Sequence, residues 1–142
     1  SALPFLKDAL RLQLERFPSV RNGLNRIEGT GLALVSAGVT RFADLFPRFV
    51  AAEPSYGLGD AQLWNALRQL TLGRSPLLLD VSESGEMWEH VLAITDAGRA
   101  VLSGSTDRVS LNGIDEWLGG VHLQGHANIW RWDEAQQRLV SV

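Results

Sequence analysis

Residues 60–81 have the sequence DAQLWNALRQLTLGRSPLLLDV, which contains the patterns of both a helix and a strand. Apolar side chains recur in the first half of this stretch at spacings of three and four, with polar side chains between them. That pattern predicts an amphipathic helix over 61–72, with Asp60 as its N-terminal cap. The apolar run at 77–81 predicts a short buried strand. A helix followed closely by a strand is therefore the centre of the expected fold.

Three further helices are expected before this stretch. Asn25 and Glu28 have the spacing of a capping box, so one helix should begin directly after Asn25. Thr40 is the expected cap of the next helix, over 41–52. The earliest helix, over 3–17, is indicated by leucines at helical spacing. The first half of the chain is therefore predicted to be helical.

The sequence after the stretch predicts mainly β structure. A turn at 82–85 leads to a returning strand over 88–95, and a short helix that Thr95 or Asp96 caps follows, ending at 102. Glycine-rich turns then alternate with short β-prone runs. The expected later strands are 109–111, 121–123, 129–132 and 138–142.

The order helix, helix, helix, strand, turn, strand is that of a winged helix–turn–helix. We therefore predict an α+β fold that forms a single compact domain over residues 1–142. Its expected parts are a helical lead (1–24), a winged-helix-like core (25–104) and a small β-rich extension (105–142).

Composition excludes several classes of protein. The 142 residues fit one domain, no apolar run reaches the 18 or so residues that a membrane span needs, and the absence of cysteine excludes disulfides and thiol chemistry. The net charge of −3 divides into +3 over residues 1–74 and −6 over the rest. No signal peptide is visible, so we expect a cytoplasmic protein without a membrane partner. Because Ser1 is not a methionine, we expect a chain cut from a longer protein.

Four stretches resemble one bacterial family. They are SALPFL (1–6), FPSVRNGLNRIE (17–28), LNGIDEWLGGVHL (111–123) and WRWD (130–133). Together they resemble the C-terminal region of the domain-of-unknown-function 1835 family. The resemblance covers nearly the whole chain. It implies an N-terminal domain that is absent here, and it implies no particular activity.

Two groups of polar residues are candidate binding sites. Arginines spaced by five residues around a turn, with a nearby amide, could converge on an anion or a partner, because guanidinium offers planar paired donors. This candidate site is Arg16, Arg21, Asn22 and Arg26; the alternative is a solvated turn with salt bridges. The predicted helix over 61–72 would be the recognition helix. Its candidate base readers are Gln62, Asn65, Arg68 and Gln69.

A third group lies in the glycine-rich region. It is the polar cluster of Asn112, Asp115, Trp117 and His122. Asp115 and His122 could act as an acid/base pair. A metal shared with His126 is disfavoured, since residues four apart on a strand are roughly 13 Å apart, and we expect no metal and no cofactor. The alternative is a structural motif of glycine turns and packed tryptophans.

The sequence is compatible with three functions. The favoured one is a non-enzymatic interaction module that binds a protein partner or its own N-terminal domain. The first alternative is a winged-helix DNA-binding regulator, which the three glutamates of the wing disfavour because they would face phosphates. The second is an enzyme, with a site near Asp115 and His122 or shared with the missing domain.

Overall fold

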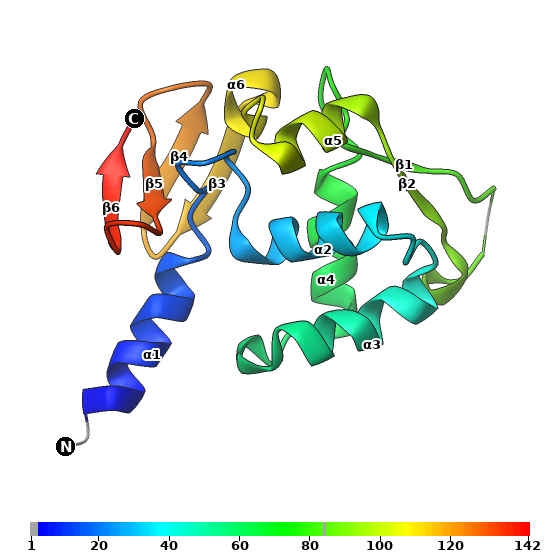
Figure 1. Ribbon diagram of the computed structural model, residues 1–142, viewed down its shortest axis with the longest axis horizontal. Helices are drawn as coiled ribbons and strands as arrows, with labels where there is room; N and C mark the ends of the chain where they lie inside the picture. Colours follow the sequence, from blue (N-terminus) through cyan, green and yellow to red (C-terminus); the bar gives the residue numbers. More distant parts are fainter. Residues whose placement is uncertain (1–2, 84) are drawn as a thin grey trace.

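The computed structural model describes residues 3–83 and 85–142, and this part of the chain has an α+β fold (Figure 1). The helices are α1 (Leu3–Leu14), α2 (Arg26–Ser36), α3 (Phe42–Ala52), η1 (Pro54–Tyr56), α4 (Asp60–Gln69), η2 (Met87–Glu89), α5 (Asp96–Ser103) and α6 (Arg108–Asn112). The strands are β1 (Leu78–Asp80), β2 (Leu92–Ile94), β3 (Ile114–Leu118), β4 (Val121–Gly125), β5 (Trp130–Asp133) and β6 (Arg138–Ser141). They form three antiparallel pairs, β1–β2, β3–β4 and β5–β6.

Helices α2 to α5 and the β1–β2 pair surround the larger of two hydrophobic clusters. The predicted capping box starts α2, because the Asn25 side chain accepts from the Glu28 amide and the Glu28 side chain accepts from the Asn25 amide. Gly31 lets α4 approach α2 closely, since a Cβ there would lie 2.6 Å from Leu67 Cδ2. The buried side chains of α4 are Leu63 and Leu67, which confirms the apolar face that the sequence predicted.

The β1–β2 pair follows α4 as expected, but both strands are short. The returning strand predicted over 88–95 is shorter in the structure and covers only Leu92–Ile94. Its expected first residues form the 3-10 helix η2 instead, and the Trp88 ring of η2 packs against Phe42 with 5.4 Å between ring centroids. A bridge between Arg41 and Val91 adds the segment before α3 to the same region. Helix α5 begins as predicted, with the Thr95 hydroxyl accepting from the Gly98 amide. The winged-helix assignment itself stays a prediction.

The C-terminal part differs from expectation at 109–111, which is helical rather than a strand. Asp107 caps α6 there by accepting from the Ser110 amide, so the β-prone side chains enter a helix. The two hairpins β3–β4 and β5–β6 follow. Their inner side chains pack with Phe17 and Val109 in a second, smaller hydrophobic cluster.

Four predicted helix ends or caps are wrong. Helix α1 stops at Leu14, and Phe17 packs in the smaller cluster instead of continuing the helical stripe. Arg41 precedes α3 without a side-chain cap, so Thr40 is not the cap. Gly59 precedes α4, and its amide donates to the Gln62 side chain, which replaces the cap expected from Asp60. Helix α4 also ends at Gln69 rather than at 72.

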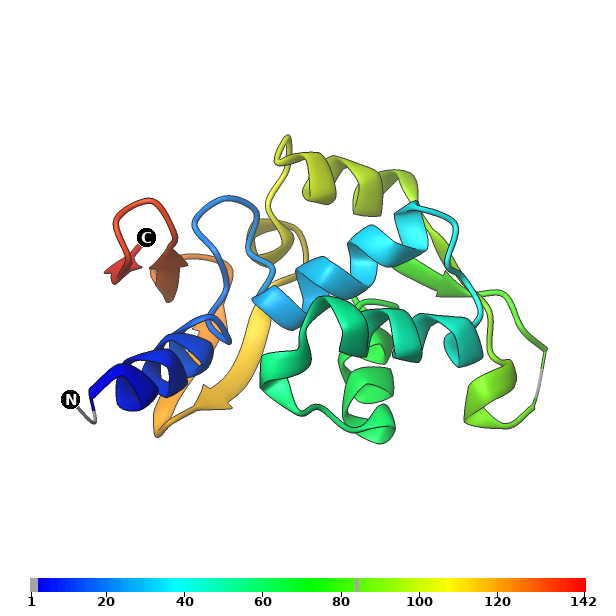
Figure 2. The ribbon, with the colours of Figure 1, turned by 60° about the horizontal axis from the view of Figure 1, so that its bottom comes forward.

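Helix α1 projects away from the rest of the fold (Figures 1 and 2). Its apolar stripe is not buried, because the Leu6 residue is 66% exposed and Leu10 is 57% exposed. Among the described residues, no helix combines the length and the apolar character that crossing a bilayer requires.

Candidate functional site

A cleft of about 850 Å³ opens between α4 and the β3–β4 hairpin. One wall consists of α4 side chains, and the other consists of β3 and the end of β4. Residues at the N-terminus of α2 and Arg108 of α6 are also part of the lining. Figure 2 shows β3 on the side of its hairpin that faces the helices. The cleft therefore lies between the helical and the β-rich parts of the chain.

Three of the four candidate base readers line this cleft. Gln62, Asn65 and Gln69 lie at helical spacing on the face of α4 opposite Leu63 and Leu67, so burying the leucines turns these amides outward. Gln62 accepts from the Gly59 amide through its side-chain oxygen. The carboxamides of Asn65 and Gln69 have no hydrogen bond to any described part of the chain.

Arg68, the fourth candidate reader, does not line the cleft, although it is exposed. Arg68 is the one basic side chain among the four candidate readers, and it therefore lies on a different part of the α4 surface from the three amide side chains. The amide-bearing face of α4 has the β3–β4 hairpin beside it, across the cleft. This arrangement separates the groups that would have to act together in a DNA groove.

Arg108 is a buried charge beside the cleft. Its Nη2 lies 3.5 Å from Glu28 Oε2, and its Nη1 lies 3.8 Å from Glu116 Oε1. These are ion pairs rather than hydrogen bonds, and the buried Nη1 has no hydrogen-bond acceptor among the described residues. Burial raises the pKa of the Glu28 carboxyl, and the nearby Arg108 only partly offsets that effect. The sequence carried no signal for this group, since Arg108 is 80 positions from Glu28.

The hairpin brings three of the four predicted cluster residues together. His122 Nε2 lies 2.6 Å from Asp115 Oδ1, and the His122 ring stacks on Trp117 with 4.3 Å between centroids and 7° between planes. The register explains the contact: Trp117 is directly opposite His122, and Asp115 is two positions along on the same face. This face is open to solvent, with the Asp115 side chain 71% exposed.

Asn112 does not belong to this cluster. Its side chain accepts from the Ser75 amide and donates to the Ser75 carbonyl, so it joins α6 to the loop before β1. His126 is also apart from His122, with its Nδ1 3.3 Å from the Ser110 carbonyl. Among residues 3–83 and 85–142, no group of three or more acidic or histidine side chains is placed to hold a metal ion.

The four residues of the candidate anion site do not come together. Arg16 faces the cleft with its guanidinium over the Tyr56 ring, whereas Arg21, Asn22 and Arg26 line a separate hollow of about 720 Å³. The Asn22 amide is already used, because it accepts from the Leu24 amide and donates to the Val101 carbonyl. Arg26 pairs with Glu53 at 2.6 Å. Asn22 and Arg26 therefore hold the fold together.

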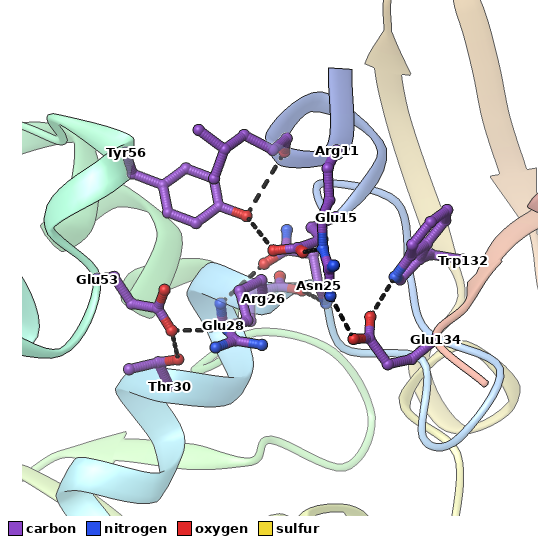
Figure 3. Close-up of polar contacts among 11 residues, drawn as sticks. Arg11, Glu15, Asn25, Arg26, Glu28, Thr30, Glu53, Tyr56, Trp132 and Glu134 are labelled. Atoms are coloured by element: carbon purple, nitrogen blue, oxygen red, sulfur yellow. Dashed lines mark hydrogen bonds and ion pairs between the residues drawn. The ribbon is translucent and has the colours of Figure 1, made fainter. Parts of the chain in front are cut away.

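A polar network beside that hollow was also missed (Figure 3). The buried Glu15 carboxylate accepts from Arg11 and from the Tyr56 hydroxyl, and Glu134 accepts from Arg11 and from the Trp132 indole. Burial and the neighbouring Glu15 charge raise the pKa of Tyr56 well above its usual value. The spacing of four between Arg11 and Glu15 was a signal for one of these pairs. The others join segments too distant in sequence to be paired by inspection.

Searches of family models, of curated proteins and of solved structures find no match to this chain. The similarity to the domain-of-unknown-function 1835 family therefore stays a prediction.

Proposed function

We propose that this chain is a non-enzymatic interaction module and that it binds a protein partner in the cleft between α4 and the β3–β4 hairpin. The observation that carries the proposal is a cleft of about 850 Å³ with accessible polar groups on both sides. Free carboxamides of α4 line one side, and β3 of the hairpin lines the other. Clefts of this size with a few convergent polar groups are where ligands bind by default.

Charge favours a protein over a nucleic acid in this cleft. Its lining contains three carboxylates, from Glu28, Asp115 and Glu116, against two guanidinium groups, from Arg16 and Arg108. A phosphate backbone would therefore meet a net negative surface, whereas stable nucleic-acid contacts need a net excess of bases. If the family resemblance is correct, a domain that precedes this chain is one such partner.

The proposal is tested by site-specific photo-crosslinking in the cells that make the protein. A benzophenone side chain placed at Gln69, inside the cleft, should crosslink to a partner protein. The matched control places it at Arg99, an exposed position on α5 outside the cleft. Filling the cleft with Asn65→Trp should abolish the crosslink from Gln69. Equal crosslinking from both positions, or crosslinking that survives Asn65→Trp, would contradict the proposal.

One observation favours an enzyme instead, namely the 2.6 Å contact between Asp115 and His122. A carboxylate hydrogen-bonded to imidazole is a common acid/base arrangement. His122 does not line the cleft, however, and solvent reaches both side chains. Mass spectrometry of the crosslinked partner separates the two functions. A mass change in the partner that disappears in His122→Asn would indicate catalysis, and an unchanged partner mass supports binding alone.

A further inference from the structure

We infer that the occupant of the cleft is an extended peptide segment with basic side chains, which adds to β3 as a third strand. The inference rests on the proposed function and specifies the chemistry of the partner. Strand addition of this kind takes its affinity from main-chain hydrogen bonds and its selectivity from the side chains beside them.

The register of the hairpin leaves one edge of β3 with unused hydrogen-bonding groups. The two-residue turn Gly119–Gly120, with φ of 55° and 84°, makes Leu118 and Val121 the first hydrogen-bonded pair. Because such pairs alternate, the amides and carbonyls of Asp115 and Trp117 point away from β4. No described residue outside the hairpin donates to or accepts from them.

The cleft lies along this edge rather than along the outer edge of β4. Every β3 residue except Trp117 lines it, whereas β4 contributes only its last two residues. Figures 1 and 2 both show β3 between β4 and the helices. A strand of five residues extends for about 17 Å, which is enough for a short extended segment to pair along it.

The opposite wall adds side-chain partners for such a segment. Asn65 and Gln69 of α4 carry free carboxamides that both donate and accept hydrogen bonds. An added strand would alternate its side chains, one set toward α4 and the other toward solvent. The cleft is therefore bounded by a strand edge on one side and by a helix face on the other.

The charges of the cleft select basic side chains. Arg108 lies between Glu28 and Glu116, so its charge is already matched, and the Glu116 side chain remains 33% exposed. The Asp115 side chain is open to solvent, and within residues 3–83 and 85–142 it pairs with His122 alone. A lysine or arginine on the added strand would neutralise these carboxylates, whereas an acidic peptide would meet like charge.

The test begins with random 12-residue peptides displayed on phage and selected on the full chain. Enriched peptides are synthesised with a fluorescein label, and their binding is measured by fluorescence anisotropy. We expect enrichment in Lys and Arg, with binding that lowers the amide hydrogen exchange of Asp115 and Trp117. The decisive variant is Trp117→Pro, which removes an outward amide that the hairpin itself does not use.

The matched control is His122→Pro, which removes the outward amide at the opposite edge of the hairpin and loses the same Trp117–His122 stack. We expect at least tenfold weaker binding in Trp117→Pro and unchanged binding in His122→Pro. If Trp117→Pro loses the hairpin signals in its NMR spectrum, Asn65→Trp replaces it by filling the cleft from the α4 wall.

Three results would overturn the inference: equal binding by both proline variants, no enriched peptides, or enrichment of acidic ones. The crosslink from Gln69 distinguishes failure of this inference from failure of the proposed function. A partner crosslink at Gln69 that Trp117→Pro does not weaken would contradict strand addition and leave partner binding in place. If the wild-type chain gives no crosslink that is specific to Gln69, both the proposed function and strand addition are contradicted.

Discussion

The two hydrophobic clusters of this chain are built differently. The larger cluster contains 14 buried apolar residues from the helical part and the β1–β2 pair, and the smaller contains six, mainly from α6 and the two C-terminal hairpins. Charged groups accompany the smaller cluster: the buried Arg131 pairs with the partly buried Asp107, and Arg108 reaches from α6 toward α2. The comparison indicates that apolar burial stabilises the helical part, whereas the β-rich part also depends on specific polar contacts.

The largest expected effect is in the helical cluster. Phe42 is fully buried, and its ring contacts Trp64 at 5.2 Å and Trp88 at 5.4 Å between centroids. We expect Phe42→Ala to lower the free energy of unfolding by about 4 kcal/mol, because it removes apolar contacts and leaves a cavity. Chemical denaturation followed by tryptophan fluorescence measures it. The control is Phe5→Ala in the exposed α1, which should change stability little. Equal effects would contradict the assignment of the core.

The second prediction removes the charge pair of the β-rich part. Arg131 donates to both Asp107 oxygens, at 2.6 and 2.8 Å, and its side chain is only 6% exposed. Burial opposes ionisation of Asp107, but the Arg131 and Ser110 hydrogen bonds outweigh it and lower the Asp107 pKa. Asp107→Asn should cost about 3 kcal/mol, since it leaves a buried arginine without its counter-charge.

Hydrogen exchange shows where Asp107→Asn acts. If the two clusters are stabilised separately, amides of β5 should lose protection while those of α3 keep theirs. The matched control is Asp96→Asn, which removes an exposed ion pair with Arg99 and should leave both sets unchanged. Uniform loss of protection across the chain would show that the clusters unfold as one unit.

The sequence predicted the helical part better than the β-rich part, and the same comparison explains why. Local patterns such as the Asn25–Glu28 box determine helix starts, so α2 and α5 were placed correctly. The strand predicted at 109–111 was wrong, because Asp107 caps a helix there and Val109 packs in the smaller cluster from that helix. The Asp115–His122 contact was anticipated from composition, but its geometry required the register of the hairpin.

The third prediction concerns pH at the boundary between the two parts. Burial raises the Glu28 pKa above its ordinary value of 4.5, so the folded state binds more protons than the unfolded state just above that pH. Stability contributed by this group therefore falls as the pH rises from 4.5 through the raised pKa. Glu28→Gln keeps an oxygen for the Asn25 amide and removes the titration.

Thermal unfolding of wild type and Glu28→Gln between pH 4 and 8 checks this. The melting temperature of wild type should fall relative to that of the variant across the window, and the difference should level off above it. Asp80 and Asp107 have lowered pKa values, so they act in the opposite direction and at lower pH in both proteins. A constant difference between wild type and variant would show that folding does not raise the Glu28 pKa.

The smallest expected effect is on the exposed face of β3–β4. Trp117 stacks on His122, and cross-strand pairs of this type contribute roughly 0.5 kcal/mol. Trp117→Ala should lower the free energy of unfolding by about that amount. His122→Ala, which also removes the contact with Asp115, should lower it by at least as much. The double variant should cost less than the two single variants together, because each of them removes the same contact. Trp130→Ala, at another exposed tryptophan, is the control without a stacked partner. Full additivity would mean that the contact between the two rings contributes nothing to stability, and that each side chain acts independently on the exposed face of the hairpin.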